Sequence, residues 1–311
     1  MSLSGLRQDS LKLILFGGKG GVGKTTCASG AGIYLSEVYN TLMISTDPAH
    51  SLADSIGQKI GNSIIKIKTF EHLSGLEISA EETFEEFKIE HENEIKTILG
   101  TSTYMDDEDI ESLFALSIPG LDEVMGFKTI VDLIEKSGYD KYIVDTAPTG
   151  HALRLLTLPG LLDDWIKVMA QMRWKYRYIV KRLSGDYKPD EGDHFLVDLK
   201  KTVKKVESIL KDSSKCEFIP VTIPEDMAIS ETERLVNSLN KYGINVKQLV
   251  VNNVLESRKC DFCQAKKKDQ EKYIKAIKEK FNTLKITIVP LQANEVKGIE
   301  VLKGFKELLF S

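Results

Sequence analysis

The chain has few cysteines and no long hydrophobic run. Four of its 311 residues are cysteine, which is too few for a disulfide framework in a chain of this length and favours a reducing compartment. No apolar run approaches the roughly 18 residues of a membrane-spanning helix. The apolar stretch at 11–16 is too short for the core of a signal peptide and runs directly into glycines. We therefore expect a soluble, cytoplasmic protein.

An excess of positive charge is also missing. The chain has 42 lysine and arginine residues against 46 aspartate and glutamate residues, a net charge of −4 with histidine neutral. Because nucleic-acid-binding domains usually carry a dense basic face, we do not expect nucleic acid to be a partner. The composition is 42% hydrophobic and 28% charged, which is ordinary for a soluble protein with a sizeable core.

Short apolar segments recur along the chain, and each is followed by turn residues and then by a helical pattern. Apolar strands that alternate with helices are typical of a parallel sheet covered on both faces. We therefore predict an α/β fold with a doubly wound, mainly parallel sheet flanked by helices. The clearest strand segments are 11–16, 41–46, 140–146, 216–224, 246–253 and 285–290.

Two stretches, about 79–127 and 159–212, do not follow this alternation, and we predict that they form a helical insertion subdomain within a single domain of residues 1–311. The second stretch contains two seams of apolar residues spaced alternately by three and four. Either the two helices pack on each other as a hairpin, or they offer part of their apolar face to a client. The first seam is Trp165, Met169, Met172, Tyr176, Ile179 and Leu183, and the second is Leu196, Leu199, Val203, Val206 and Leu210.

A phosphate-binding motif, GGKGGVGKTT at 17–26, follows the first apolar segment and fits the pattern G-x-x-x-x-G-K-[ST]. Glycines in such a loop let backbone N–H groups point at phosphate oxygens, beside a helix N-terminus whose dipole favours anions. We expect Lys24 to bridge the β- and γ-phosphates of ATP and Thr25 to hold Mg²⁺. The predicted nucleotide-binding residues of the loop are Gly18, Lys19, Gly20, Gly21, Val22, Gly23, Lys24, Thr25 and Thr26.

Three more charged residues complete the predicted catalytic machinery. Lys19 is a second lysine that the motif does not require, and it is either a solvated loop charge or a cation that reaches a nucleotide on a facing subunit. Asp47 and Asp145 each follow an apolar segment, where parallel sheets place their ligands. One such aspartate is usually a helix cap, but two behind a complete phosphate loop favour a catalytic interpretation. We predict that Asp145 lies on the magnesium side and that Asp47 orients the attacking water.

The segment CDFC at 260–263 has the spacing of half a zinc site. A structural zinc ion is held by four nitrogen or sulfur ligands in a tetrahedron, usually supplied as two such pairs. The remaining cysteines, Cys27 and Cys216, are isolated in sequence, and we expect them to be buried, inert thiols. A redox pair of the thioredoxin type is the alternative, but the motif lies late in the chain within a lysine-rich segment.

Together these motifs resemble one family, which comprises the arsenical pump-driving ATPases and the cytosolic ATPases that target tail-anchored membrane proteins. The resemblance runs from about Leu11 to Leu309. It implies the fold of a P-loop NTPase with a deviant Walker A motif, of the SIMIBI class, and a homodimer with nucleotides at the interface. It rests on KGGVGKTT with its additional lysine, STDPAHS, SIPGLDEVMGF, DTAPTGHALRLL and the paired cysteines.

The resemblance also implies roles for individual residues. Lys19 is expected to contact the ATP of the opposite subunit, and Asp47 to activate water. Glu225 and Asn252 are expected to contact nucleotide, Asn252 at the adenine, and the loop around Pro290 is expected to lie near the base.

In the targeting members of this family, the matching cysteine pair meets its twin across the two-fold axis. The resemblance therefore implies that Cys260 and Cys263 share one Zn²⁺ with the same pair in a second copy of the chain, as isologous symmetry allows.

The two branches of the family make different demands on cysteine. The resemblance implies that pump-branch members sense the metalloid with cysteines between the nucleotide motifs and the helical region, because soft metalloids need thiolates. Here no cysteine lies between Cys27 and Cys216. We therefore predict a Mg²⁺-dependent, ATP-hydrolysing homodimer that binds transmembrane segments of tail-anchored proteins and delivers them to a membrane receptor. The alternatives are an ATPase subunit that drives arsenite or antimonite efflux through a membrane channel, and a dimeric ATP-driven switch with a soluble partner.

Overall fold

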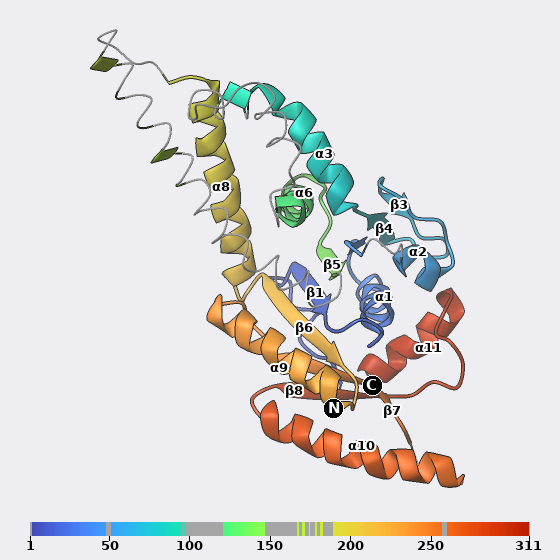
Figure 1. Ribbon diagram of the computed structural model, residues 1–311. Helices are drawn as coiled ribbons and strands as arrows, with labels where there is room; N and C mark the ends of the chain where they lie inside the picture. Colours follow the sequence, from blue (N-terminus) through green and yellow to red (C-terminus); the bar gives the residue numbers. More distant parts are fainter. Residues whose placement is uncertain are drawn as a thin grey trace. The chain divides into compact units, whose positions relative to one another are not determined.

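The structure of the protein is a computed structural model, shown in Figure 1. It describes residues 2–47, 51–94, 96–97, 121–146, 189–256 and 260–310, together with single positions between 167 and 182.

The chain divides into two compact units, which are described separately. The sheet unit comprises residues 1–79, 132–153 and 209–311, and the helical unit comprises 80–131 and 154–208. The assignment of the whole chain to one ATPase domain, with an insertion at about 79–127 and 159–212, stays a prediction.

An eight-stranded sheet, with strand order β3-β4-β2-β5-β1-β6-β7-β8, forms the centre of the sheet unit. Neighbouring strands are parallel, except that β3 runs antiparallel to β4. Strand order reverses direction at β1, which is where α/β sheets of this kind bind ligands. The predicted fold class is confirmed. The strands are β1 Leu13–Gly17, β2 Thr41–Ser45, β3 Ile65–Lys66, β4 Leu73–Glu77, β5 Lys141–Asp145, β6 Cys216–Thr222, β7 Gln248–Val254 and β8 Lys285–Pro290.

All six predicted strand segments overlap a strand of the sheet, whereas β3 and β4 were not predicted. Every residue of β4 is buried, but its sequence LSGLE is interrupted by serine and glycine, which conceals an apolar run. A Cβ at Gly75 would lie 3.0 Å from side-chain atoms of both Ile60 and Ile67. The glycine therefore lets these two isoleucines cover the strand closely.

The helices of the sheet unit pack on the sheet and on one another. Helix α1 packs against β1, β2 and β5 and against α11, while α9 packs against β6 and α10 against α9 (Figure 1). The small residues of α1 permit this close packing, since a Cβ at Gly32 would clash with the sulfur of Met43 in β2. The helices are α1 Lys24–Leu35, α2 Ser51–Ile56, α9 Asp226–Lys241, α10 Asp261–Lys280 and α11 Ile299–Phe310.

Helices α3 Ala80–Glu90, α6 Leu121–Lys136 and α8 Glu191–Lys211 contribute most of the described part of the helical unit. Phe87 and Phe195 pack near His91, with ring centroids 5.9 Å apart between the two phenylalanines. The second predicted seam lies in α8, and all five of its residues are buried. The first seam lies outside the described residues.

Within the described part of the chain, no helix has the length and apolarity needed to span a bilayer.

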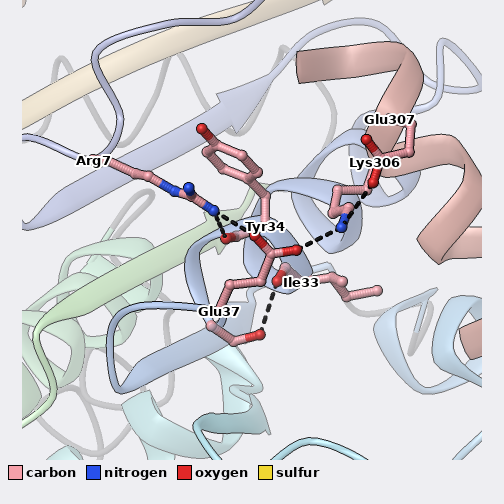
Figure 2. Close-up of polar contacts among 7 residues, drawn as sticks. Arg7, Ile33, Tyr34, Glu37, Lys306 and Glu307 are labelled. Carbon is pink, nitrogen blue, oxygen red and sulfur yellow. Dashed lines mark hydrogen bonds and ion pairs between the residues drawn. The ribbon is translucent and has the colours of Figure 1, made fainter. Parts of the chain in front are cut away.

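A polar network joins the N-terminal segment, the end of α1 and the C-terminal helix α11 (Figure 2). The Arg7 guanidinium lies 3.7 Å from the centroid of the Tyr34 ring and donates a 2.9 Å hydrogen bond to the Tyr34 carbonyl. Glu37 accepts from Arg7 and from Lys306, each at 2.5 Å. The Tyr34 ring also stacks on Phe310 at 3.8 Å. Both chain ends are thereby fixed to the C-terminal end of α1, opposite the phosphate loop.

Candidate functional site

The phosphate loop connects β1 to α1, and its backbone adopts positive φ at Gly18, Gly21 and Gly23. Gly18 has φ of 156° and Gly23 has φ of 91°, a region that side chains disfavour. A Cβ at Gly18 would clash with the Val221 carbonyl oxygen, and one at Gly23 would clash with the Asn252 side chain. The loop therefore lies tightly against the ends of β6 and β7, and α1 begins with Lys24 directly after it.

Thr25 and Asp145 form a hydrogen-bonded pair beneath the loop. β5 lies beside β1 with Asp145 in register with Phe16. The carboxylate of Asp145 therefore lies next to Thr25 in the first turn of α1. The Thr25 hydroxyl donates a 2.6 Å hydrogen bond to Asp145 Oδ2. Asp145 is 1% exposed, and its burial raises the pKa of the carboxyl to about 7, although the Thr25 bond and the Lys24 charge act in the opposite direction.

These groups fit a magnesium ion. Asp145 Oδ1 is buried and has no hydrogen-bond partner among the described residues, and a buried carboxylate oxygen without a partner is costly. Mg²⁺ prefers oxygen ligands and is usually bound by one or two carboxylates together with substrate phosphates. A cation here would give Oδ1 a partner and offset the burial of the carboxylate charge. Thr25 and Asp145 are the residues that would hold it.

Lys24 and Asp47 lie close enough to Asp145 to interact with it electrostatically. Lys24 is buried and donates a 3.3 Å hydrogen bond from Nζ to the Lys19 carbonyl. Burial lowers the pKa of Lys24, while the charges of Asp145 and Asp47 raise it. Asp47 follows β2 and is half-buried, and its N–H donates a 3.2 Å hydrogen bond to Ser45 Oγ. The structure therefore brings four predicted residues together.

An open cavity of about 500 Å³ extends from the phosphate loop to the segment after β8. Asn252 donates a 3.0 Å hydrogen bond from Nδ2 to the Val22 carbonyl, and its Oδ1 is buried without a partner among the described residues. Pro290 ends β8, and its carbonyl accepts a 2.8 Å hydrogen bond from Gln292. The lining of the cavity includes Gly21, Gly23, Thr25, Thr26, Ser51, Asp54, Ser55, Asn252, Asn253, Leu291, Gln292, Asn294, Glu295, Val296 and Lys297.

Two predicted site residues, Lys19 and Glu225, lie toward α9 and are not among the cavity's lining residues. Lys19 Nζ is 3.9 Å from Glu231 Oε1 of the same chain. Glu225 is exposed at the N-terminal cap position of α9, and its N–H donates to the Ile223 carbonyl. Their roles toward nucleotide therefore stay predictions.

The cysteine pair lies at the start of α10. Cys260 is the N-cap residue of α10, and its sulfur accepts a 3.2 Å hydrogen bond from the Cys263 N–H. Hydrogen bonds from Cys263 lower the pKa of Cys260, which favours the thiolate that metals bind. One chain thus presents two sulfur donors, half of a tetrahedral set. By contrast, Cys27 and Cys216 are buried, and burial raises the pKa of each thiol.

Sequence reasoning missed Ser51 and Glu77. The Ser51 hydroxyl lies 3.3 Å from Thr25 Oγ1 and 3.4 Å from Asp145 Oδ2. Glu77 is a buried carboxylate at the end of β4 that accepts a 2.9 Å hydrogen bond from the Ala53 N–H in α2. Ser51 is the last residue of the segment STDPAHS, which also contains Asp47. That shared segment was the available sequence signal for a role of Ser51 in the site. Glu77 ends a strand that was itself not predicted.

Comparison with known proteins decides the family. The family described as anion-transporting ATPase matches residues 11–311. The chain belongs to the anion-transporting ATPase family. This confirms the predicted resemblance and the P-loop ATPase class, in which ATP is the nucleotide.

Several named ATPases are similar to the chain over nearly its whole length. "ATPase ASNA1 homolog 2" of Paramecium tetraurelia is 38% identical, over 98% of this chain and 95% of the relative. "ATPase get3" of Botryotinia fuckeliana is 35% identical over 98% and 92%, respectively. "ATPase ASNA1 homolog" of Dictyostelium discoideum is 36% identical over 98% and 91%. The similarity covers both compact units.

Proposed function

We propose that the protein is a Mg²⁺-dependent ATPase that binds transmembrane segments of tail-anchored proteins and delivers them to a membrane receptor. The observation that carries the ATPase part is the buried Thr25–Asp145 pair beneath a phosphate loop. The resemblance described above, and full-length relatives named as get3 and ASNA1 ATPases, support the targeting role.

Each residue of the site has a distinct part in the proposed hydrolysis. The loop N–H groups and Lys24 bind the phosphates, and the buried ammonium of Lys24 offsets their negative charge. Thr25 and Asp145 would hold the magnesium ion, which would neutralise negative charge on the phosphates of ATP. Asp47 orients the attacking water and accepts its proton. Its half-exposed position, with a charge that acts on Lys24 and Asp145, supports this role.

The proposed functional unit is a homodimer. Lys19 would act on the nucleotide of the facing subunit, and Cys260 and Cys263 would share one Zn²⁺ with the same pair in the second copy. The exposed Phe262, between the two cysteines, is 74% accessible in the single chain. Aromatic side chains are enriched at protein interfaces. The exposure of Phe262 therefore supports a dimer in which this ring is buried against Phe262 of the second copy.

Purified components provide the test of this function. The protein is incubated with ATP and a newly synthesised model client that ends in one apolar transmembrane helix, and then offered liposomes. We expect Mg²⁺-dependent ATP hydrolysis, a soluble complex with the client, and no complex when two lysines interrupt the client's helix. A protein that hydrolyses ATP but leaves the client to aggregate would refute the targeting role, and one that hydrolyses no ATP would refute the whole proposal.

The same preparation addresses the metalloid alternative. Because no cysteine lies between Cys27 and Cys216, arsenite or antimonite should leave the rate of ATP hydrolysis unchanged. A large stimulation that persists in the double variant Cys260→Ser, Cys263→Ser would favour the pump branch.

A further inference from the structure

Ser51 lies inside the proposed magnesium site, although no part of the phosphate-loop motif requires a residue there. Its hydroxyl is 3.3 Å from Thr25 Oγ1 and 3.4 Å from Asp145 Oδ2. Thr25 and Asp145 are themselves joined at 2.6 Å, so the three oxygens form one cluster. The proposed ion-binding side of the loop therefore carries two hydroxyl groups and one carboxylate.

The two contacts of Ser51 are longer than the hydrogen bond between Thr25 and Asp145. A hydroxyl has one proton to donate, and the short bond from Thr25 to Asp145 uses that of Thr25. The two contacts of Ser51 are both long for O–H···O hydrogen bonds, which centre near 2.7–2.8 Å. The Ser51 hydroxyl thus lies at the site with only long contacts, while Asp145 Oδ1 has no partner among the described residues.

The position of Ser51 is set from outside the phosphate loop. Its helix, α2, is attached to the sheet by the bond from the Ala53 N–H to Glu77. It is attached to the segment after β8 by the 2.8 Å bond from the Gly298 N–H to the Ser55 carbonyl and by the pair Asp54–Lys297 at 3.7 Å. Ser51 is therefore placed by the same segment that lines the cavity beside the loop.

We propose that Ser51 is a positioning residue of the magnesium–nucleotide site, whose hydroxyl supports the hydration shell of the ion and the orientation of Asp145. Mg²⁺ gives up its water reluctantly and usually keeps several molecules, which need fixed oxygen partners such as this hydroxyl. The proposal rests on the proposed ATPase function. It assigns α2 a role in metal affinity in addition to the phosphate loop.

The test measures metal binding directly, with Mn²⁺ as the probe. Electron paramagnetic resonance of free Mn²⁺ gives its affinity for the full-length protein saturated with ADP, and calorimetry gives the ADP affinity in EDTA. In Ser51→Ala we expect Mn²⁺ affinity to fall about tenfold, with ADP affinity in EDTA unchanged. Ser51→Thr, which keeps the hydroxyl, should stay within about twofold of the parent. Ser63→Ala, at an exposed serine after α2, is the matched control.

The outcomes separate this proposal from the function on which it rests. If Ser51→Ala binds Mn²⁺ as the parent does while Thr25→Ala does not, the role of Ser51 is wrong and the magnesium site stands. An equal loss of ADP affinity in EDTA, or no rescue by Ser51→Thr, would show a purely structural role and overturn the proposal. A parent protein that binds no Mn²⁺ with ADP would remove the proposed ATPase function itself.

Discussion

At the scale of single residues, Asp145 combines deep burial with a carboxylate oxygen that has no partner among the described residues. Burial raises its pKa to about 7. Between about pH 4 and pH 7, the folded state therefore holds a proton that the unfolded chain has released. The free energy of unfolding must then fall as pH rises through this window.

We predict that Asp145→Asn removes this pH dependence in metal-free and nucleotide-free protein. Relative to the variant, the parent should lose stability with rising pH at up to about 1.4 kcal/mol per pH unit, and the difference should level off above about pH 7. Urea unfolding in EDTA at several pH values provides the measurement. Asp269→Asn, at an exposed aspartate of α10, should follow the parent. A parallel profile for Asp145→Asn would show that this carboxyl ionises normally in the fold.

Asp47 should separate chemistry from binding. Because Lys24 and the loop amides hold the phosphates, Asp47→Asn is expected to bind ATP with an affinity close to that of the parent. Loss of a group that positions water and takes its proton should lower the turnover number by about 100-fold or more. Phosphate release and calorimetric ATP binding measure the two effects, and Asp269→Asn again serves as the control. Turnover at the parent rate would exclude Asp47 as the base.

At the scale of elements, the network of Figure 2 shows how the N-terminal segment stabilises α1. Arg7 stacks on Tyr34, bonds to its carbonyl and pairs with Glu37. We predict that Arg7→Ala lowers the free energy of unfolding by about 1–2 kcal/mol. Arg7→Lys should recover less than half of the loss, because an ammonium lacks the planar, forked geometry.

Urea unfolding of the three proteins gives these values, with Arg234→Ala, on the exposed side of α9, as the matched control. Equal stability of Arg7→Lys and the parent would show that charge alone matters at this position. An unchanged Arg7→Ala would show that the packing of Tyr34 on Phe310 holds the chain ends without the arginine.

The parts of the fold and site that could be predicted are those that depend on residues close together in the sequence. Strands such as β1 and β5 contain uninterrupted apolar residues, and the loop after β1 has its own motif, so Thr25 and Asp145 could be placed together from sequence. The contact of Ser51 with them was not predicted, because the motif STDPAHS marks only its segment, whereas the position of α2 depends on Glu77 and Gly298, which are distant in sequence. The strand β4 was hidden for a related reason, since Gly75 is explained only by the isoleucines that cover it.

At the scale of the whole molecule, the proposed dimer makes a complementation experiment possible. Lys19→Ala and Asp47→Asn chains should each be inactive alone. In a mixed dimer, one nucleotide meets Asp47 of its own chain and Lys19 of the facing chain, so that site is complete. Equal mixing should restore about a quarter of the parent rate, since half of the dimers are mixed and each has one complete site. Mixed dimers that form, as shown by differently tagged chains, and remain inactive would place Lys19 on its own chain's nucleotide.

Zinc content is a second test of the proposed two-fold symmetry. Cys260 and Cys263 supply two sulfurs at the start of α10, and within the described residues of one chain no cluster of three or more metal-binding side chains occurs. Two thiolates leave a tetrahedral ion half coordinated, so a stable site needs the same pair from a second chain.

We therefore predict one zinc ion per two chains in protein purified without chelator or oxidant, measured by elemental analysis alongside light scattering. Cys260→Ser should contain no zinc and should dissociate to monomers at concentrations at which the parent stays dimeric. Because α10 lies outside the phosphate loop, raising the variant's concentration should restore part of its ATPase rate. Cys216→Ala, at a buried thiol of β6, should keep the parent's zinc content. One zinc per chain, or none in the parent, would rule out the shared site, because symmetry allows the two pairs to meet only around a single ion.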